Sequence, residues 1–178
     1  ISHFPEGKRL ELAHQEQGAL LTINGSYFTE EFTPTGLFVD NGKTISSQAY
    51  APDESGTLLI ENGRASFITE AIDTTNITAK TDVLQSFPLL MTDGKANIST
   101  DSGKIARRTA IATDEQGRLV IVIVDQTALS LFRFAQLLAE SDLALTEALN
   151  LDGGPSTGLM YADDQFAESY LPLMPLPI

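Results

Sequence analysis

A loop near the C-terminal end of the chain has the sequence Asn-Leu-Asp-Gly-Gly-Pro-Ser-Thr-Gly, at positions 150–158. A hydrophobic core does not require that order of residue types. Paired glycines let the backbone adopt positive φ angles or approach a ligand closely. We therefore interpret the segment as a ligand-binding or catalytic loop, although an isolated Asp-Gly-Gly is more often a tight turn. The polar residues of this loop are Asp152, Ser156 and Thr157, and its paired glycines are Gly153 and Gly154.

Polar side chains also stand at the ends of three other apolar segments. Asn24, Gly25, Ser26 and Tyr27 follow the apolar run 19–23, Asp125 closes the run 119–124, and Arg107 and Arg108 precede the segment 109–113. If the last two segments form an antiparallel hairpin, Arg108 and Asp125 lie near the same end. Because successive residues of a strand point to opposite faces, only one of the two arginines can face a given cleft.

These residue types suit phosphate binding and glycosidic bond cleavage. An arginine can hold a phosphate through two parallel hydrogen bonds, each contributing about 1.5–3 kcal/mol. The alternative is a weak surface ion pair between an arginine and Asp125 or Asp152. Glycosidic cleavage uses one carboxylic acid and one carboxylate as base or nucleophile. With phosphate as the leaving group, acid assistance matters less and neutralisation by arginine matters more.

Other chemistries fit the sequence poorly. Residues 154–158 match the Gly-x-Ser-x-Gly string of serine hydrolases, but the only histidines, His3 and His14, lie far upstream rather than after the serine. With two histidines and no cysteine, the usual zinc ligands, disulfides and a cysteine nucleophile are excluded. We predict no required cofactor, while calcium or magnesium on Asp125 or Asp152 with backbone carbonyls stays open.

Composition sets further limits. The 178 residues suit one domain with a real core. A formal charge of −13 repels nucleic acid and anionic membranes, so an anionic substrate needs a local arginine. No apolar run approaches the roughly 20 residues that span a bilayer. No signal peptide is visible, and the chain starts at Ile1 without methionine, so we expect a removed leader or a trimmed chain.

The chain in order predicts short strands joined by turns. A helix is expected over residues 8–17, with Gly18 as its stop, and a strand over 19–23. Asn-Gly pairs at 41–42 and 62–63 and Asp-Gly at 93–94 predict hairpins or turns between apolar runs. The segment from Glu70 to Thr81 is ambiguous. Residues 96–104 are expected to form a loop.

The second half is clearer. The β-branched run 119–124 predicts a central strand with both faces covered. Thr127 or Ser130 could cap a helix that runs from Leu131 to about Glu140, since apolar residues recur there at helical spacing. Residues 144–151 then lead to the loop at 150–158. The proline-rich tail is not a helix, and an edge strand or an extended end would suit it.

Three motifs together resemble the phosphodiester glycosidase family. They are NGSYF at 24–28, RRTAIATDEQGRLVIVIVDQ at 107–126 and ALNLDGGPSTGLMY at 148–161, and PLLMTDGK at 88–95 is also similar. The resemblance runs from about Ala19 to the C-terminus, in the family's order and with similar spacing. It implies an α+β fold with a mainly antiparallel, hairpin-rich mixed sheet and a few packed helices, in a single domain over residues 1–178.

The resemblance also implies hydrolysis of the bond between a sugar anomeric carbon and a phosphodiester, on a small-molecule or glycan substrate. It implies Asp152 as a catalytic carboxylate, Arg108 as a phosphate clamp and Asp125 as a second carboxylate or orienting group. Which carboxylate is the acid is left open. The remaining residues expected to bind substrate are Asn24, Gly25, Ser26, Tyr27, Arg107, Thr109, Gly153, Gly154, Ser156 and Thr157.

The chain departs from the family pattern at several positions. Pro155 and Gln126 stand where the family usually has glycine, and Phe134 stands where it often has glutamate. The strands that normally precede the first motif are expected to be missing or shortened. These departures affect the expected identity of the substrate more than the expected location of the site.

Two other functions are compatible with the sequence. One is a non-catalytic module that binds sugar phosphates or cell-envelope glycans in the same pocket, and the other is a structural envelope protein in which the loop is only a turn. The family resemblance and the absent leader suggest an exported, periplasmic bacterial protein that acts on exopolysaccharide or the cell envelope.

Overall fold

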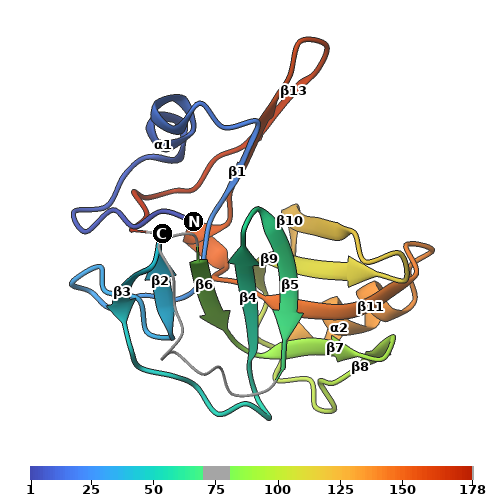
Figure 1. Ribbon diagram of the computed structural model, residues 1–178. Helices are drawn as coiled ribbons and strands as arrows, with labels where there is room; N and C mark the ends of the chain where they lie inside the picture. The colour runs from blue at the N-terminus through green and yellow to red at the C-terminus, as the bar shows by residue number, and fades with distance from the viewer. Residues whose placement is uncertain (70–80, 178) are drawn as a thin grey trace.

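A computed structural model describes residues 1–69 and 81–177 of the chain, so most of the ambiguous segment 70–81 lies outside the described residues. The described part contains two five-stranded sheets, one three-stranded sheet and two α-helices (Figure 1). The strands are β1 (Leu21–Ile23), β2 (Phe38–Asp40), β3 (Lys43–Ser46), β4 (Gly56–Glu61), β5 (Arg64–Ile68), β6 (Thr81–Ser86), β7 (Leu89–Thr92), β8 (Lys95–Ala96), β9 (Ala106–Asp114), β10 (Leu119–Leu129), β11 (Leu145–Asn150), β12 (Leu159–Ala162) and β13 (Ala167–Tyr170). The helices are α1 (Leu10–Gln17), α2 (Leu131–Ala139) and the short 3-10 helix η2 (Gly154–Ser156).

The sheet that carries most of the site has the strand order β10-β9-β11-β7-β8. Helix α2 lies against this sheet, and its buried Phe134, Ala135 and Leu138 pack with Ala110 and Ala112 of β9. Of the two predicted caps, Ser130 is confirmed, because its hydroxyl accepts from the backbone N–H of Arg133 at 3.3 Å, whereas Thr127 lies in β10. The amphipathic stripe of α2 is therefore core, and it fixes the face of β9 from which Arg108 projects.

The second sheet has the order β3-β2-β6-β4-β5 and packs against the first. Its Leu58, Leu84 and Phe38 share a buried cluster with Ile111 and Leu149 of the first sheet. The predicted turns at Asn41-Gly42 and Asn62-Gly63 are confirmed, since both asparagines and both glycines have positive φ angles between paired strands. All the strand pairs of the described residues are antiparallel, which narrows the predicted mixed sheet to an antiparallel one.

The third sheet, in the order β1-β12-β13, projects from the body of the molecule together with α1 (Figure 1). Strand β1 pairs with β12, so Asn24-Gly25 does not close a local hairpin. An Asn-Gly pair favours a hairpin turn, but the partner of β1 lies 136 to 140 positions further along the chain, and this long-range pairing prevails. Helix α1 ends at Gly18 in the left-handed conformation, as predicted.

Several predicted elements were wrong. The run 119–124 belongs to β10, which is an edge strand of its described sheet rather than a central one, and β10 continues to Leu129. Its β-branched side chains fit a pleated surface in either position, so sequence alone could not separate the two. The expected loop 96–104 begins inside β8, and β12 and β13 were not predicted. No described helix is long and apolar enough to cross a membrane.

Candidate active site

The buried side chain of Asn24 joins the three sequence motifs. Its Nδ2 donates to the backbone carbonyl of Asp152 at 2.8 Å and to that of Gly25 at 3.2 Å. Its Oδ1 accepts from the Thr109 hydroxyl at 2.7 Å and from the Gly158 N–H at 3.0 Å. An amide has two donor hydrogens and two acceptor lone pairs, so these four bonds use its full capacity. Asn24 and Thr109 therefore hold the motifs together, and their expected contact with substrate stays a prediction.

Asp152 follows β11 at the start of the Gly-Gly loop. Its backbone N–H donates to the Gly25 carbonyl at 3.1 Å, and its Oδ1 accepts from the Gly153 N–H at 2.8 Å. Burial raises the pKa of Asp152, while hydrogen bonds from the Ser156 hydroxyl and the Gly153 N–H act in the opposite direction. Desolvation has the larger effect, so the fold favours the protonated carboxyl more than water does.

Arg108 is a buried residue, only 9% exposed. Its Nε donates to the Leu129 carbonyl at 2.8 Å and one Nη donates to the Lys104 carbonyl at 2.9 Å. In residues 1–69 and 81–177 no carboxylate forms an ion pair with it. Burial lowers the pKa of Arg108, as expected for a cation removed from water without a counter-ion. A buried unpaired cation is costly, and an anionic ligand would neutralise it.

Tyr27 reaches the same place from the first motif. Its hydroxyl accepts from Asn150 Nδ2 at 2.6 Å, and Asn150 also donates to the Phe87 carbonyl at 3.2 Å. Burial and the nearby charge of Asp152 raise the pKa of Tyr27 to about 12, whereas the charge of Arg108 lowers it. The tyrosine therefore keeps its proton at neutral pH and lies within electrostatic range of both Asp152 and Arg108.

Arg107 points to the other face of β9 and pairs with Asp125 at 2.6 Å. Val124 lies opposite Arg108 in the register, so the predicted hairpin of β9 and β10 is confirmed. Arg107 also donates to the Gly154 carbonyl at 2.9 Å and to the Pro155 carbonyl at 3.4 Å. The sequence left open whether an arginine pairs with Asp125 or Asp152, and in the structure Arg107 pairs with Asp125. Arg107 thereby links β10 to the Gly-Gly loop. This arrangement fits the orienting role of Asp125 rather than that of a free carboxylate.

Glycine is required at positions 153 and 154 for two different structural reasons. A Cβ at Gly153 would lie 2.7 Å from the Arg107 carbonyl oxygen and 3.9 Å from Arg108 Cδ. Gly154 has a φ of +57°, and a Cβ added there would meet open space. The first glycine therefore permits close approach of the loop to β9, and the second supplies the left-handed turn that starts η2.

Unpaired buried polar atoms gather in the motifs. Among the described residues the side-chain atoms without a hydrogen-bond partner are Ser26 Oγ, Ser86 Oγ, Asn150 Oδ1 and Thr157 Oγ1. Ser26 belongs to the first motif, and Asn150 and Thr157 belong to the third. Such atoms are rare in native proteins and usually mark a bound water, an ion or a function.

The structure thus brings Tyr27, Arg108, Asp152 and the loop N–H groups together. Asn150 and Phe87 also belong to this site but were not among the residues expected to act. Asn150 could have been found as the last residue of a strand whose neighbours carry the other polar groups, whereas Phe87 left no sequence signal. No three histidine, cysteine or acidic side chains of the described residues converge on a metal-sized site. A calcium or magnesium ion held largely by backbone carbonyls stays a prediction.

A separate cavity of about 340 Å³ lies under the first motif, beside α1 and β1. Asn24 and Gly25 contribute to its wall, but most of its lining is apolar, including Leu58, Leu84 and Ile111. Its lining contains neither Arg108, Asp152 nor Tyr27. This cavity is distinct from the polar site.

Comparison with known proteins places this arrangement in a family. The profile described as phosphodiester glycosidase matches residues 17–172. No curated protein is significantly similar in sequence. Among solved structures, the catalytic domain of zebrafish N-acetylglucosamine-1-phosphodiester alpha-N-acetylglucosaminidase, auto-inhibited by its pro-peptide, matches with a TM-score of 0.71 and 19% identity over 93% of this chain. A hypothetical protein from Synechocystis matches with a TM-score of 0.61 and 16% identity over 90% of this chain.

The chain spans 60% of the length of the zebrafish structure and 50% of that of the Synechocystis structure. At these identities the structural matches establish a shared fold. The sequence profile covers most of the chain, including all three motifs that meet at Asn24. The chain therefore belongs to the phosphodiester glycosidase family.

Proposed function

We propose that this protein hydrolyses the bond between the anomeric carbon of a sugar and the oxygen of a phosphodiester. Water adds to the anomeric carbon, the bond from that carbon to the phosphate oxygen breaks, and a free sugar and a phosphomonoester leave. The observation that carries this proposal is Arg108, a buried guanidinium without a carboxylate partner among the described residues. A phosphodiester carries one negative charge and accepts hydrogen bonds from a guanidinium in a planar, bidentate geometry.

Asp152 and Tyr27 complete the proposed site. The raised pKa of Asp152 favours a protonated carboxyl, and the charge of a bound phosphodiester would raise that pKa further. We assign Asp152 to donate a hydrogen bond or a proton to the leaving phosphate oxygen. Tyr27 accepts from Asn150, which leaves its own hydroxyl hydrogen for a phosphate or sugar oxygen. The Gly153 N–H is already used by Asp152, and the Gly154 N–H offers a further donor.

The test is hydrolysis of a chromogenic sugar-1-phosphodiester by the wild-type chain and by Asp152→Asn and Arg108→Lys. Turnover by the wild-type chain and its loss in Asp152→Asn would support the proposal. Arg108→Lys keeps the charge but not the planar fork, so it should lower kcat/KM about 10- to 100-fold. Binding without turnover across a panel of sugars would instead indicate a non-catalytic binding module.

A further inference from the structure

A groove of about 790 Å³ opens beside the site at Phe87. Its walls come from the loop before β4, from the start of β7 and from the segment after β8. Its volume is within the range of ligand sites, roughly 300–1,000 Å³. The residues on which the inference depends are Asp53, Glu54, Phe87, Thr92 and Asn97.

Phe87 is the point where the groove meets the proposed catalytic centre. Its backbone carbonyl accepts from Asn150, which also holds the Tyr27 hydroxyl. Its ring lies 4.9 Å from the ring of Tyr27 and 4.6 Å from that of Tyr50. The Tyr50 hydroxyl is in turn hydrogen-bonded to Thr35. The Phe87 side chain is therefore fixed on two sides, yet 38% of it is exposed.

A fixed, exposed aromatic ring suits a sugar. The ring face carries negative charge density, and the C–H groups on one face of a pyranose are weakly positive and apolar, so the two stack. Around the ring the groove offers polar groups for hydroxyls. Asp53 and Glu54 are exposed, and among the described residues no cation pairs with either carboxylate. The Thr92 hydroxyl accepts from Asn97 at 2.9 Å, which leaves its own hydrogen to donate.

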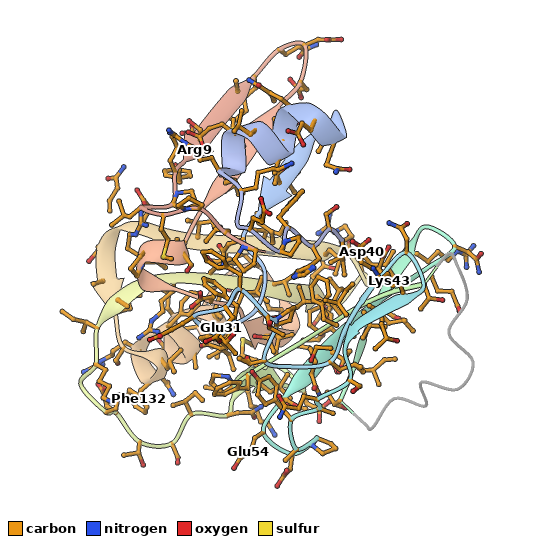
Figure 2. The ribbon with its side chains drawn as sticks, turned by 90° about the vertical axis from the view of Figure 1, so that its left-hand side faces the viewer. Arg9, Glu31, Asp40, Lys43, Glu54 and Phe132 are labelled. Carbon is orange, nitrogen blue, oxygen red and sulfur yellow. The ribbon has the colours of Figure 1, made fainter. Side chains whose placement is uncertain are left out.

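The charges favour a neutral sugar. Carboxylates accept from sugar hydroxyls in strong hydrogen bonds but repel uronic acids and phosphates. Glu54 lies at the edge of the molecule in Figure 2, and Asp53 and Glu54 are both exposed, which suits the rim of the groove. The backbone N–H of Leu89 donates to the Glu54 carbonyl at 3.1 Å, which holds this rim against β7.

We propose that the groove binds a neutral sugar unit of a glycan, next to the sugar whose phosphodiester bond is cleaved. This inference rests on the proposed function and narrows it. The preferred substrate then carries at least one sugar beyond the reacting one. The reacting sugar lies near Tyr27 and Asp152, and the next sugar stacks on Phe87.

The test compares short and long substrates. For the wild-type chain, kcat/KM should be higher for a phosphodiester of a neutral di- or trisaccharide than for that of the single sugar. Phe87→Ala should lower the ratio of the two kcat/KM values about tenfold, which is the range expected for one lost aromatic contact. Phe166→Ala removes an exposed ring in the β12–β13 hairpin, 55% exposed against 38% for Phe87, and should leave the ratio unchanged. If the ratio is unchanged in Phe87→Ala, the groove inference is overturned, but the proposed hydrolase function is not.

A second variant avoids the packing of Phe87. The double substitution Asp53→Lys and Glu54→Lys changes exposed side chains only, and binding is measured by calorimetry in the inactive Asp152→Asn background. The probes are neutral oligomers of glucose or N-acetylglucosamine and anionic oligomers of galacturonate. The protein with the unaltered rim should bind the neutral oligomers more tightly than the anionic ones. The lysine variant should bind the anionic oligomers at least several-fold more tightly than the protein with the unaltered rim does. If neutral oligomers bind and Phe87→Ala abolishes that binding, but no phosphodiester is turned over, the groove is a sugar-binding site and the proposed hydrolase function is rejected. No binding of either class would reject the groove.

Discussion

The side-chain amide of Asn24 donates to the backbone carbonyl of Asp152 at 2.8 Å, across 128 positions of the chain. The same side chain accepts from Thr109 and from Gly158. Three segments that are distant in sequence therefore meet on one buried amide. This contact helps to hold the Gly-Gly loop in position, so a change at Asn24 acts first on the loop.

Asn24→Ala should destabilise the fold. The substitution leaves the Thr109 hydroxyl and the Gly158 N–H buried without an acceptor, at about 1–3 kcal/mol for each such group. We expect the free energy of unfolding in urea to fall by at least about 2 kcal/mol. Gln165→Ala removes an exposed amide and serves as the control. Lost substrate affinity with unchanged stability would show that Asn24 is a substrate ligand instead.

Arg108 should bind inorganic phosphate. Phosphate at about 10 mM should raise the melting temperature of the wild-type chain, because a ligand that binds only the native state stabilises it. Arg108→Gln should abolish that increase, whereas Arg107→Gln should retain it, since Arg107 is already paired with Asp125. A phosphate effect that survives in Arg108→Gln would place the anion site elsewhere.

The pH dependence of stability should reveal the buried Asp152. Burial raises its pKa, so the folded chain holds the proton more tightly than the unfolded chain. The contribution of Asp152 to stability therefore falls as the pH rises from the pKa of Asp152 in the unfolded chain, about 3.9, through its higher pKa in the folded chain. Asp152→Asn should be more stable than the wild-type chain at pH 7, with the difference vanishing near pH 3. Equal pH profiles of the two proteins would contradict the raised pKa.

Asp114 provides a control of opposite sign. The backbone N–H of Arg118 donates to its carboxylate, and this and the other hydrogen bonds lower the pKa of Asp114. Its contribution is present above the unfolded pKa and is lost as pH falls through the lower folded value. Asp114→Asn should therefore be less stable than the wild-type chain at neutral pH, and the difference should shrink on acidification.

The pair Arg107–Asp125 should act on the loop through geometry. Both side chains are partly exposed, at 20% and 24%, so a double-mutant cycle should give a coupling of about 0.5–1.5 kcal/mol. Asp125→Asn frees Arg107, which holds the Gly154 carbonyl, and should lower kcat more than it raises KM. A loss of activity as complete as that of Asp152→Asn would show that Asp125 reacts directly.

The two loop glycines should respond differently to alanine. In Gly153→Ala the new Cβ meets the Arg107 carbonyl at 2.7 Å, so the loop must move away from Arg108 and activity should fall at least tenfold. In Gly154→Ala the space is open, but the positive φ costs about 1–2 kcal/mol of stability. Gly154→Asn, which tolerates that conformation better, should recover part of the loss. Equal activity of the two alanine variants would contradict this distinction.

Sequence alone predicted the available chemistry and determined several local elements. The Asn-Gly turns, the Gly18 helix stop, the Ser130 cap and the β9–β10 hairpin follow from local backbone preferences and side-chain periodicity, which act over a few residues. The order of the three motifs indicated the family, and the alternation of a strand established that Arg107 and Arg108 face opposite sides. These features need no knowledge of distant contacts.

Only the tertiary structure decided what each polar residue does. The pairing of β1 with β12 turned Asn24 inward. Of the two neighbouring arginines, Arg107 pairs with Asp125, and Arg108 has no carboxylate partner among the described residues. The position of β10 at a sheet edge, and that of Phe87 between two tyrosine rings, depend on long-range packing. Burial, ion pairing and pKa are properties of the assembled surroundings. A residue type in a motif therefore predicts the available chemistry, and the contacts made on folding determine whether that chemistry is used.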